Sequence, residues 1–151
     1  QIRRSWYVFF FQLPWMPERF MSADDWRGAV SALRGSGRIH TFTKADIAKY
    51  KEAWSQPGAM TAMLNWYRAV IRHMPKLPKE PRVKVRTLMM WGMKDFALSH
   101  RMARPSMDHV DEGNLIFFPE ATHWVQHDEA EEVNHYLVDF IFDKASLIPV
   151  K

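Results

Sequence analysis

Two short apolar runs in the second half of the chain constrain its fold most. Residues 87–91 (TLMMW) and 115–118 (LIFF) show no alternation of apolar and polar side chains, and each precedes a turn and a helical pattern. Such runs are typical of strands buried on both faces of a parallel sheet, and their alternation with helices predicts α/β architecture. Two strands do not form a stable doubly wound sheet alone, so we expect a fragment of a larger α/β fold.

The first half of the chain carries helical patterns instead. Residues 1–21 indicate an irregular segment, with a helix opening at Pro17. Ser22 is a residue type that commonly caps the start of a helix, and Asp24 and Asp25 would stabilise the first turn of the helix that follows it. The apolar face of that helix contains Trp26, Val30 and Leu33, and Gly35 ends it.

Two more helices are predicted before the strands. Thr43 and Asp46 have the spacing of a capping box, and a stripe of Ile47, Tyr50 and Trp54 follows, up to Pro57 and Gly58. The next helix is predicted over residues 59–73, with Met63, Trp66, Tyr67 and Val70 on one side. Pro75, Pro78 and Pro81 then indicate a stiff, exposed linker.

The second half contains two predicted helices. One lies around residues 99–109, between the two strands, and the other covers residues 129–144. The last helix carries Val133, Leu137, Phe140 and Ile141 on one face. The predicted order is therefore strand, helix, strand, helix.

The composition excludes several classes of protein. The net charge is +4, but Lys and Arg are interleaved with Asp and Glu, so we expect no nucleic-acid partner. No Cys is present, which excludes disulfides and thiolate metal sites and favours a cytoplasmic location. The apolar runs are too short to span a bilayer, although a membrane anchor upstream stays open. Because the first residue is Gln1, we expect the sequence to start inside a longer one.

One acid and one imidazole follow the two predicted strands. Asp95 comes after the first strand across a glycine turn, and His123 follows the second strand. Sites in parallel α/β sheets form beyond the carboxyl ends of the strands. The order Asp…His matches α/β-hydrolase triads, in which the nucleophile comes earlier. An imidazole can take a proton near neutral pH, and a carboxylate can fix its tautomer.

Four short motifs resemble those of the epoxide hydrolase branch of the α/β-hydrolases. Residues 91–95 (WGMKD) are similar to the acid motif W-G-x-x-D, and residues 121–124 (ATHW) to the base motif. Residues 7–14 (YVFFFQLP) match the lid pattern Tyr-x-x-x-Phe-Gln-x-Pro, and residues 65–68 (NWYR) match the second lid motif. The likeness covers essentially the whole chain. The small-x-Asp-x-Gly nucleophile elbow and the His-Gly-x-Pro oxyanion loop do not occur in it.

The resemblance implies a two-part organisation and a mechanism. Residues 1–80 would form most of a helical lid, and residues 81–151 the last part of the hydrolase core. His123 and Asp95 would activate water, while Tyr7 and Tyr67 would hold the oxygen of a small apolar epoxide that becomes a vicinal diol. No metal or organic cofactor is implied. The residues expected to line the substrate pocket are Trp124, Phe96, Phe11 and Trp66.

Other interpretations stay open. A haloalkane or haloacid dehalogenase shares the fold, but that branch binds halide through Trp or Asn N–H groups. A non-catalytic fragment that needs a complementary chain would also fit the abundance of Trp, Phe and Met. We expect this chain alone to be inactive, because the nucleophile would lie on a missing N-terminal half. A homodimer also stays open as the assembly that this protein forms.

Overall fold

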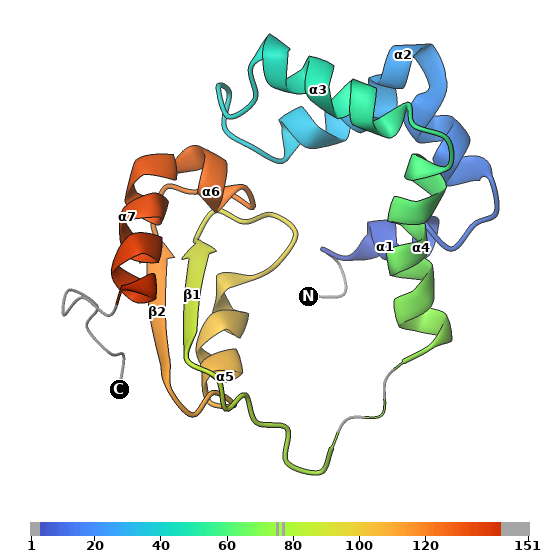
Figure 1. Ribbon diagram of the computed structural model, residues 1–151. Coiled ribbons are helices and arrows are strands. Elements are labelled where there is room, and N and C mark those ends of the chain that lie inside the picture. Colours follow the sequence, from blue (N-terminus) through green and yellow to red (C-terminus); the bar gives the residue numbers. More distant parts are fainter. Residues whose placement is uncertain (1–3, 75, 77, 143–151) are drawn as a thin grey trace. The chain divides into compact units, whose positions relative to one another are not determined.

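The computed structural model describes residues 4–74, 76 and 78–142. The chain divides into two compact units, Gln1–Lys76 and Leu77–Lys151 (Figure 1). The first unit is helical and the second contains a parallel sheet with helices, as the sequence predicts. In the described residues, no helix combines the length and the apolar character needed to cross a membrane.

Among the described residues, the first unit contains four helices, and two of them begin as predicted. They are α1 (Trp6–Phe10), α2 (Met16–Gly35), α3 (Lys44–Trp54) and α4 (Ala59–Arg72). The capping box of α3 is present: Thr43 N donates to Asp46 Oδ2 at 2.9 Å, and Asp46 N donates to Thr43 Oγ1 at 3.1 Å. Helix α1 lies in a segment for which the sequence indicated no regular structure.

Helix α2 differs from its prediction. It begins at Met16, with Pro17 in its first turn, so Ser22 lies inside the helix rather than at its N-cap. A kink follows, where Asp24, Asp25 and Trp26 have φ values of 50°, 55° and 67°. Left-handed backbone costs roughly 1–2 kcal/mol per non-glycine residue, so other contacts must hold it.

The contacts of Trp26 supply a reason for this kink. Its indole N–H donates to Ser55 Oγ at 3.1 Å, and its ring centroid lies 5.9 Å from that of Trp54. Asp25 also forms an ion pair with Lys51. The kink packs against α3 and against Ser55, which follows α3. These contacts therefore outweigh the local preference for a straight helix.

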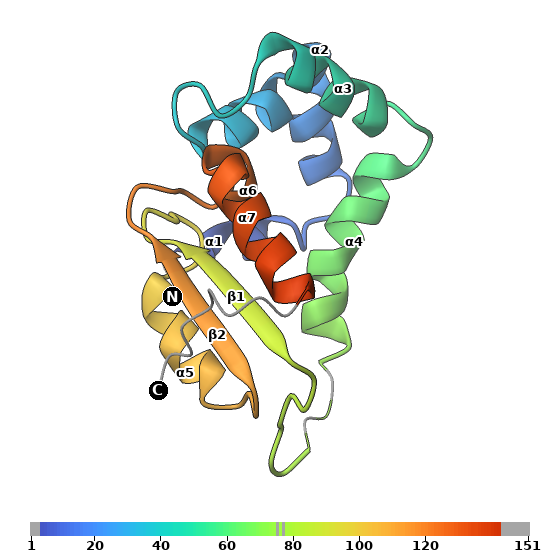
Figure 2. The same ribbon diagram turned by 60° about the vertical axis from the view of Figure 1, so that its left-hand side comes forward.

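The described part of the second unit is built on two parallel strands. Strand β1 (Thr87–Gly92) pairs with β2 (Gly113–Phe118), with Met89 opposite Leu115 and Trp91 opposite Phe117. A 3-10 turn (His100–Met102) and α5 (Ala103–Met107) connect them, and α6 (Val125–Asp128) and α7 (Ala130–Ile141) follow. Helices α5 and α7 lie on opposite faces of the sheet (Figures 1 and 2).

The core of the second unit is small. Phe118, Ala121 and Val133 are buried, and four half-buried side chains pack around them: Met90, Ile116, Val125 and Tyr136. The expectation that both strands are buried on both faces is wrong, since most of their residues are only half-buried. A sheet of two strands and short helices has too little protein around it to cover both faces.

The buried face of α7 also differs from the prediction. Val133 and Asp139 are buried, whereas Leu137 is exposed and Ile141 is 65% exposed. Tyr136 packs on the core instead, so the helix is rotated relative to the predicted apolar face. The helix ends at Ile141, and the predicted end at residue 144 lies outside the described residues.

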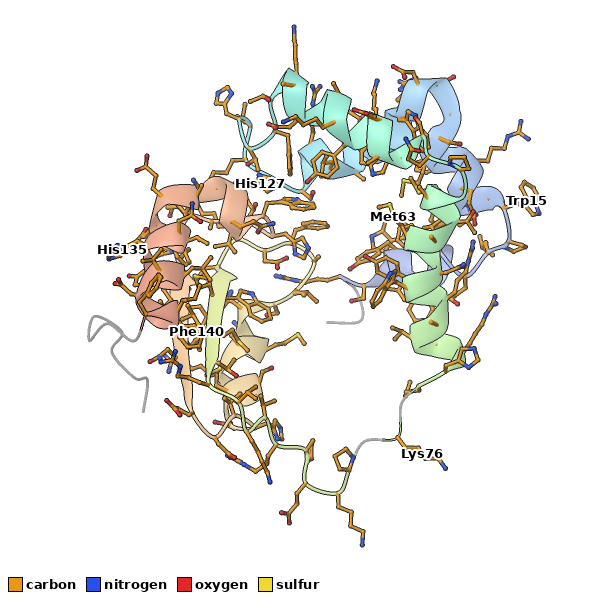
Figure 3. All side chains as sticks on the ribbon, viewed as in Figure 1. Trp15, Met63, Lys76, His127, His135 and Phe140 are labelled. Atoms are coloured by element: carbon orange, nitrogen blue, oxygen red, sulfur yellow. The ribbon has the colours of Figure 1, made fainter. Side chains whose placement is uncertain are left out.

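The segment before β1 is more tightly held than a free linker. Val83 forms a parallel bridge with Val110, and Arg82 pairs with Asp111 at 2.5 Å. Arg86 donates to the Phe140 carbonyl at 2.6 Å, and its guanidinium lies 4.5 Å from the ring centroid of Phe140 (labelled in Figure 3). Of the three predicted linker prolines, Pro75 lies outside the described residues.

Candidate active site

Asp95 sits in the loop that leaves the carboxyl end of β1. Its side chain is buried, with the residue 8% exposed. The Oδ1 atom accepts hydrogen bonds from the backbone N–H groups of Ala97 at 2.8 Å and Leu98 at 2.9 Å. These two bonds fix the carboxylate and direct its other oxygen toward the next loop.

His123 sits in the loop that leaves β2 and meets this oxygen. Its Nδ1 lies 2.9 Å from Asp95 Oδ2. The side chain of His123 is 38% exposed, so the ring is held at one end and accessible at the other. If Nδ1–H donates to the carboxylate, Nε2 is the nitrogen that can accept a proton.

The two loops are joined by their main chains. Met93 N donates to the Phe118 carbonyl and Lys94 N to the Ala121 carbonyl, each at 2.9 Å. A Cβ atom on Gly92 would lie 2.0 Å from the carbonyl oxygen of Thr122, so only glycine permits this approach. Lys94 and Glu120 add an ion pair between the loops. These contacts between the main chains bring the loops of Asp95 and His123 together.

The electrostatics of the pair suit a base and its orienting acid. Burial alone would raise the pKa of Asp95, but the hydrogen bonds from His123, Leu98 and Ala97 hold it below its ordinary value. The hydrogen bond to Asp95 raises the pKa of His123, and burial opposes that effect only in part. The carboxylate consequently stabilises the imidazolium form.

Two aromatic rings flank His123. The ring of Trp124 lies 5.5 Å from the imidazole and that of Phe96 lies 6.4 Å away, both edge to face. Phe96 is exposed. The structure thus brings two of the four predicted pocket residues beside the imidazole.

Tyr7 and Tyr67 meet within the first unit. Tyr7 is on α1 and Tyr67 on α4, and their ring centroids are 5.8 Å apart at 81°. Phe11 is buried and packs against both, at 5.7 Å from Tyr7 and 4.9 Å from Tyr67. Phe11 therefore supports the two phenol rings from within the unit.

A buried arginine joins the two tyrosine segments. Arg68 Nε donates to the Phe11 carbonyl at 2.9 Å, and Nη2 donates to the Leu13 carbonyl at 3.0 Å. The guanidinium also forms two bonds with Glu18, at 2.7 and 3.0 Å, which lower the pKa of Glu18. Gln12 adds a bond from Nε2 to the Tyr67 carbonyl at 3.1 Å.

Arg68 and Gln12 both lie within the two lid motifs. Arg68 ends the NWYR motif and Gln12 lies inside the YVFFFQLP motif, but the motifs alone do not indicate what either side chain binds. The structure shows that both bind main-chain carbonyls next to the tyrosine positions. The motifs contain the scaffold of the tyrosine pair as well as the pair itself.

The apolar stripe of α4 is exposed rather than buried. An open hollow of about 510 Å³ is lined by Met63, Trp66, Tyr67 and Val70, and Figure 3 labels Met63 on this helix. Trp66 is 79% exposed. The residues that α4 buries are Leu64 and Arg68, on the other side of the helix. The four side chains of the predicted stripe, Tyr67 among them, therefore lie on one side of α4, and that side is exposed.

The candidate residues thus form two clusters, one in each unit: Tyr7 with Tyr67 and Phe11, and Asp95 with His123, Phe96 and Trp124. Among the residues that the structure describes, no three or more His, Asp or Glu side chains gather in a way that could hold a metal ion.

Several curated proteins are similar to nearly the whole chain. The AB hydrolase superfamily protein YfhM of Bacillus subtilis is 40% identical over 139 residues, which are 91% of this chain and 48% of that protein. Mouse epoxide hydrolase 3 is 34% identical over 95% of this chain, and human epoxide hydrolase 4 is 33% identical over 93%. The chain spans 39% and 40% of these two proteins, so it matches less than half of each relative.

Solved structures show the same fold. An epoxide hydrolase of Bacillus megaterium, crystallised with an inhibitor, aligns with a TM-score of 0.76 over 92% of this chain and 51% of its own, at 22% identity. The protein Cfl2 of Burkholderia cenocepacia aligns with a TM-score of 0.78 over 92% of this chain and 48% of its own, at 21% identity. No protein-family model matches the sequence. The chain therefore has the fold of the α/β-hydrolases, and it is similar to the C-terminal part of proteins that are named AB hydrolase or epoxide hydrolase.

Proposed function

We propose that this chain supplies the acid, the base and the two lid tyrosines of an epoxide hydrolase. Residues 1–80 are the lid in this proposal, residues 81–151 are the end of the core, and the nucleophilic Asp lies on an N-terminal half outside these 151 residues. The observation that carries the proposal is the edge-to-face pair of Tyr7 and Tyr67, at 5.8 Å between ring centroids. The second support is the pair of Asp95 and His123, joined at 2.9 Å.

Two phenols suit the opening of an epoxide. Attack on an epoxide carbon leaves a developing alkoxide, which is a poor leaving group unless it receives a hydrogen bond and then a proton. A phenol, with a pKa of about 10, can supply both as the charge appears. One well-placed donor of this kind typically contributes about 3–4 kcal/mol of transition-state stabilisation. A halide, by contrast, needs no proton to leave.

The reaction then has two steps. The Asp carboxylate of the N-terminal half attacks an epoxide carbon, the C–O bond breaks, and a tyrosine protonates the alkoxide, which gives an alkyl-enzyme ester. Nε2 of His123 next takes a proton from water, and the hydroxide formed attacks the ester carbonyl. Asp95 stabilises the resulting imidazolium. The ester C–O bond then breaks, and the leaving alkoxide takes the proton held by His123, which gives the diol. The proton left on the Asp carboxyl group returns to the phenolate, so the carboxylate, the imidazole and the phenol are all restored.

The side chains around the tyrosines support the proposed substrate class. The hollow beside Tyr67 is bordered by Met63, Trp66 and Val70, which are apolar. Apolar walls with a few polar groups are typical of small-molecule pockets. We therefore propose a small apolar epoxide, with Trp66, Phe96, Phe11 and Trp124 as the residues nearest to it or supporting its site.

A chimera tests this proposal. The N-terminal part of Bacillus subtilis YfhM, up to the start of the similarity, would be joined to this chain and assayed with styrene oxide. The expected result is formation of the vicinal diol, with Tyr7→Phe or Tyr67→Phe each lowering kcat by about 100- to 1,000-fold. The chain alone should form none.

Two outcomes would contradict the proposal. One is release of halide from a haloalkane by the chimera, unaffected by Tyr7→Phe, which would indicate a dehalogenase. The other is a folded chimera without activity toward either substrate, which would indicate a non-catalytic role. Circular dichroism of the chimera and of the Tyr50→Phe control, altered outside the tyrosine pair, separates these results from misfolding.

A further inference from the structure

The residues on either side of His123 are held by one carboxylate. Asp128 Oδ2 accepts a hydrogen bond from Thr122 N at 2.7 Å and another from Thr122 Oγ1 at 2.6 Å. The same hydroxyl oxygen accepts from Trp124 N at 3.3 Å. Asp128 therefore binds the residue before His123 directly and the residue after it through Thr122.

Asp128 is itself anchored to this loop. It is the last residue of α6, and its backbone N–H donates to the Trp124 carbonyl at 2.9 Å. The backbone N–H of the preceding residue, His127 (labelled in Figure 3), donates to the same carbonyl at 2.8 Å. Residues 122–128 thus form a closed loop of hydrogen bonds from which the imidazole projects, and we call this loop the histidine clamp.

The opposite side of the loop is fixed by β1. The carbonyl of Thr122 would lie 2.0 Å from a Cβ on Gly92, and Lys94 N donates to the Ala121 carbonyl. The main chain at Thr122 is therefore held from both sides, by the strand and by Asp128. A turn of only four residues, such as α6, would not by itself fix the position of His123.

We propose that Asp128 is a positioning residue for His123, which it holds within hydrogen-bonding distance of Asp95 by clamping Thr122. The catalytic consequence rests on the proposed function, whereas the geometry of the clamp does not. The clamp requires an acceptor oxygen at residue 128 and a hydroxyl at residue 122. It does not require the negative charge of Asp128.

The protonation of His123 in the 151-residue chain reports this geometry without an activity assay. The contact with Asp95 raises the pKa of His123, so a displaced loop should lower that pKa. The neighbouring ionisable side chains (Lys94 with Glu120, His127 and Glu129) stay unchanged in every variant below. Nitrogen NMR of the assigned His123 ring gives its titration curve.

Asp128→Asn and Asp128→Ala distinguish the loss of the acceptor oxygen at residue 128 from the loss of its negative charge. Asparagine keeps an acceptor oxygen and should retain the raised pKa of His123, whereas alanine should lower it by about half a pH unit or more. Glu131→Ala, which removes the same charge from an exposed site on α7, should leave it unchanged. An unaltered pKa in Asp128→Ala would overturn the proposal, and so would equal falls in Asp128→Asn and Asp128→Ala, because a charge effect would then explain them.

The hydroxyl of Thr122 provides a second pair of variants if Asp128→Ala does not fold. Thr122→Ser keeps the hydroxyl and should retain the raised pKa of His123, and Thr122→Val, of similar shape, should lower it. Equal titration curves for these two variants would contradict the clamp. Because neither result depends on turnover, the clamp can fail while the epoxide hydrolase assignment stands, and the reverse also holds.

Discussion

The two units hold their candidate catalytic side chains by opposite arrangements of donors and acceptors. In the first unit, side-chain donors reach main-chain carbonyls: Arg68 binds the carbonyls of Phe11 and Leu13, and Gln12 binds that of Tyr67. In the second unit, main-chain N–H groups reach carboxylates: those of Ala97 and Leu98 bind Asp95, and that of Thr122 binds Asp128.

This difference predicts which changes each site tolerates. The pair of Tyr7 and Tyr67 depends on the long polar side chains of Gln12 and Arg68, so it should be sensitive to truncation of either one. The pair of Asp95 and His123 depends on close contact between two backbone segments and should be sensitive to any atom added between these segments. The three predictions below test that contrast, beginning with the largest expected effect.

Gly92→Ala should destabilise the second unit most. The added methyl would meet the backbone oxygens of Thr122 at 2.0 Å and of Ala121 at 2.6 Å, so one strand end must move. We expect a loss of about 3 kcal/mol in the free energy of unfolding, measured by urea denaturation. Gly35→Ala is the matched control, because a Cβ there meets nothing within 4 Å, and it should be neutral or slightly stabilising. Equal effects at the two glycines would contradict this view of the second unit.

Arg68→Ala should have the next largest effect. It leaves Glu18 without its bidentate partner and two carbonyls without their donor. The ion pair is only partly buried, so we expect a loss of about 2 kcal/mol rather than the larger value of a fully buried pair. The measurement is again urea denaturation, followed through the aromatic near-UV signal. Arg72→Ala, on an exposed position of α4, should change the free energy by less than about 0.5 kcal/mol, and a similar loss there would remove Arg68 from its proposed role.

Asp95→Asn should have the smallest effect on stability, and one that depends on pH. The lowered pKa of Asp95 stabilises the fold above the ordinary carboxyl value and stops doing so as the pH falls through the folded value. The raised pKa of His123 stabilises the fold below the ordinary imidazole value and stops doing so as the pH rises through the folded value. Both contributions overlap between about pH 4 and 6.5.

Thermal unfolding at several pH values checks this prediction. The difference in Tm between the unaltered chain and Asp95→Asn should be largest within that window and smaller on either side of it. A difference that does not vary with pH would mean that the two groups do not share a charge interaction.

The sequence predicted the parts of the structure that depend on local patterns. Both strands, the capping box of Thr43 and the loop positions of Asp95 and His123 follow from short-range chemistry, and the structure confirms that the two side chains meet. These features need only neighbouring residues or the general geometry of parallel sheets. They could therefore be derived without knowledge of the tertiary contacts.

The features that the sequence did not reveal arise from distant partners. The kink at Asp24–Trp26 depends on Ser55, 29 residues away, and Arg68 finds Phe11 across 57 residues. The orientation of α7 depends on which of its apolar residues the sheet receives, so Tyr136 replaces Leu137 in the core. Helical periodicity defines a set of faces, but only packing selects the buried one.

The most direct test of the central claim separates the two halves of the proposed reaction. In the chimera with His123→Gln, the tyrosines can still open the epoxide, but no base activates water. Intact-mass measurement after mixing with styrene oxide should show one added substrate mass on the nucleophilic Asp, and the addition should vanish in Tyr7→Phe/Tyr67→Phe. Undiminished diol formation by His123→Gln, or ester formation without both tyrosines, would contradict the account.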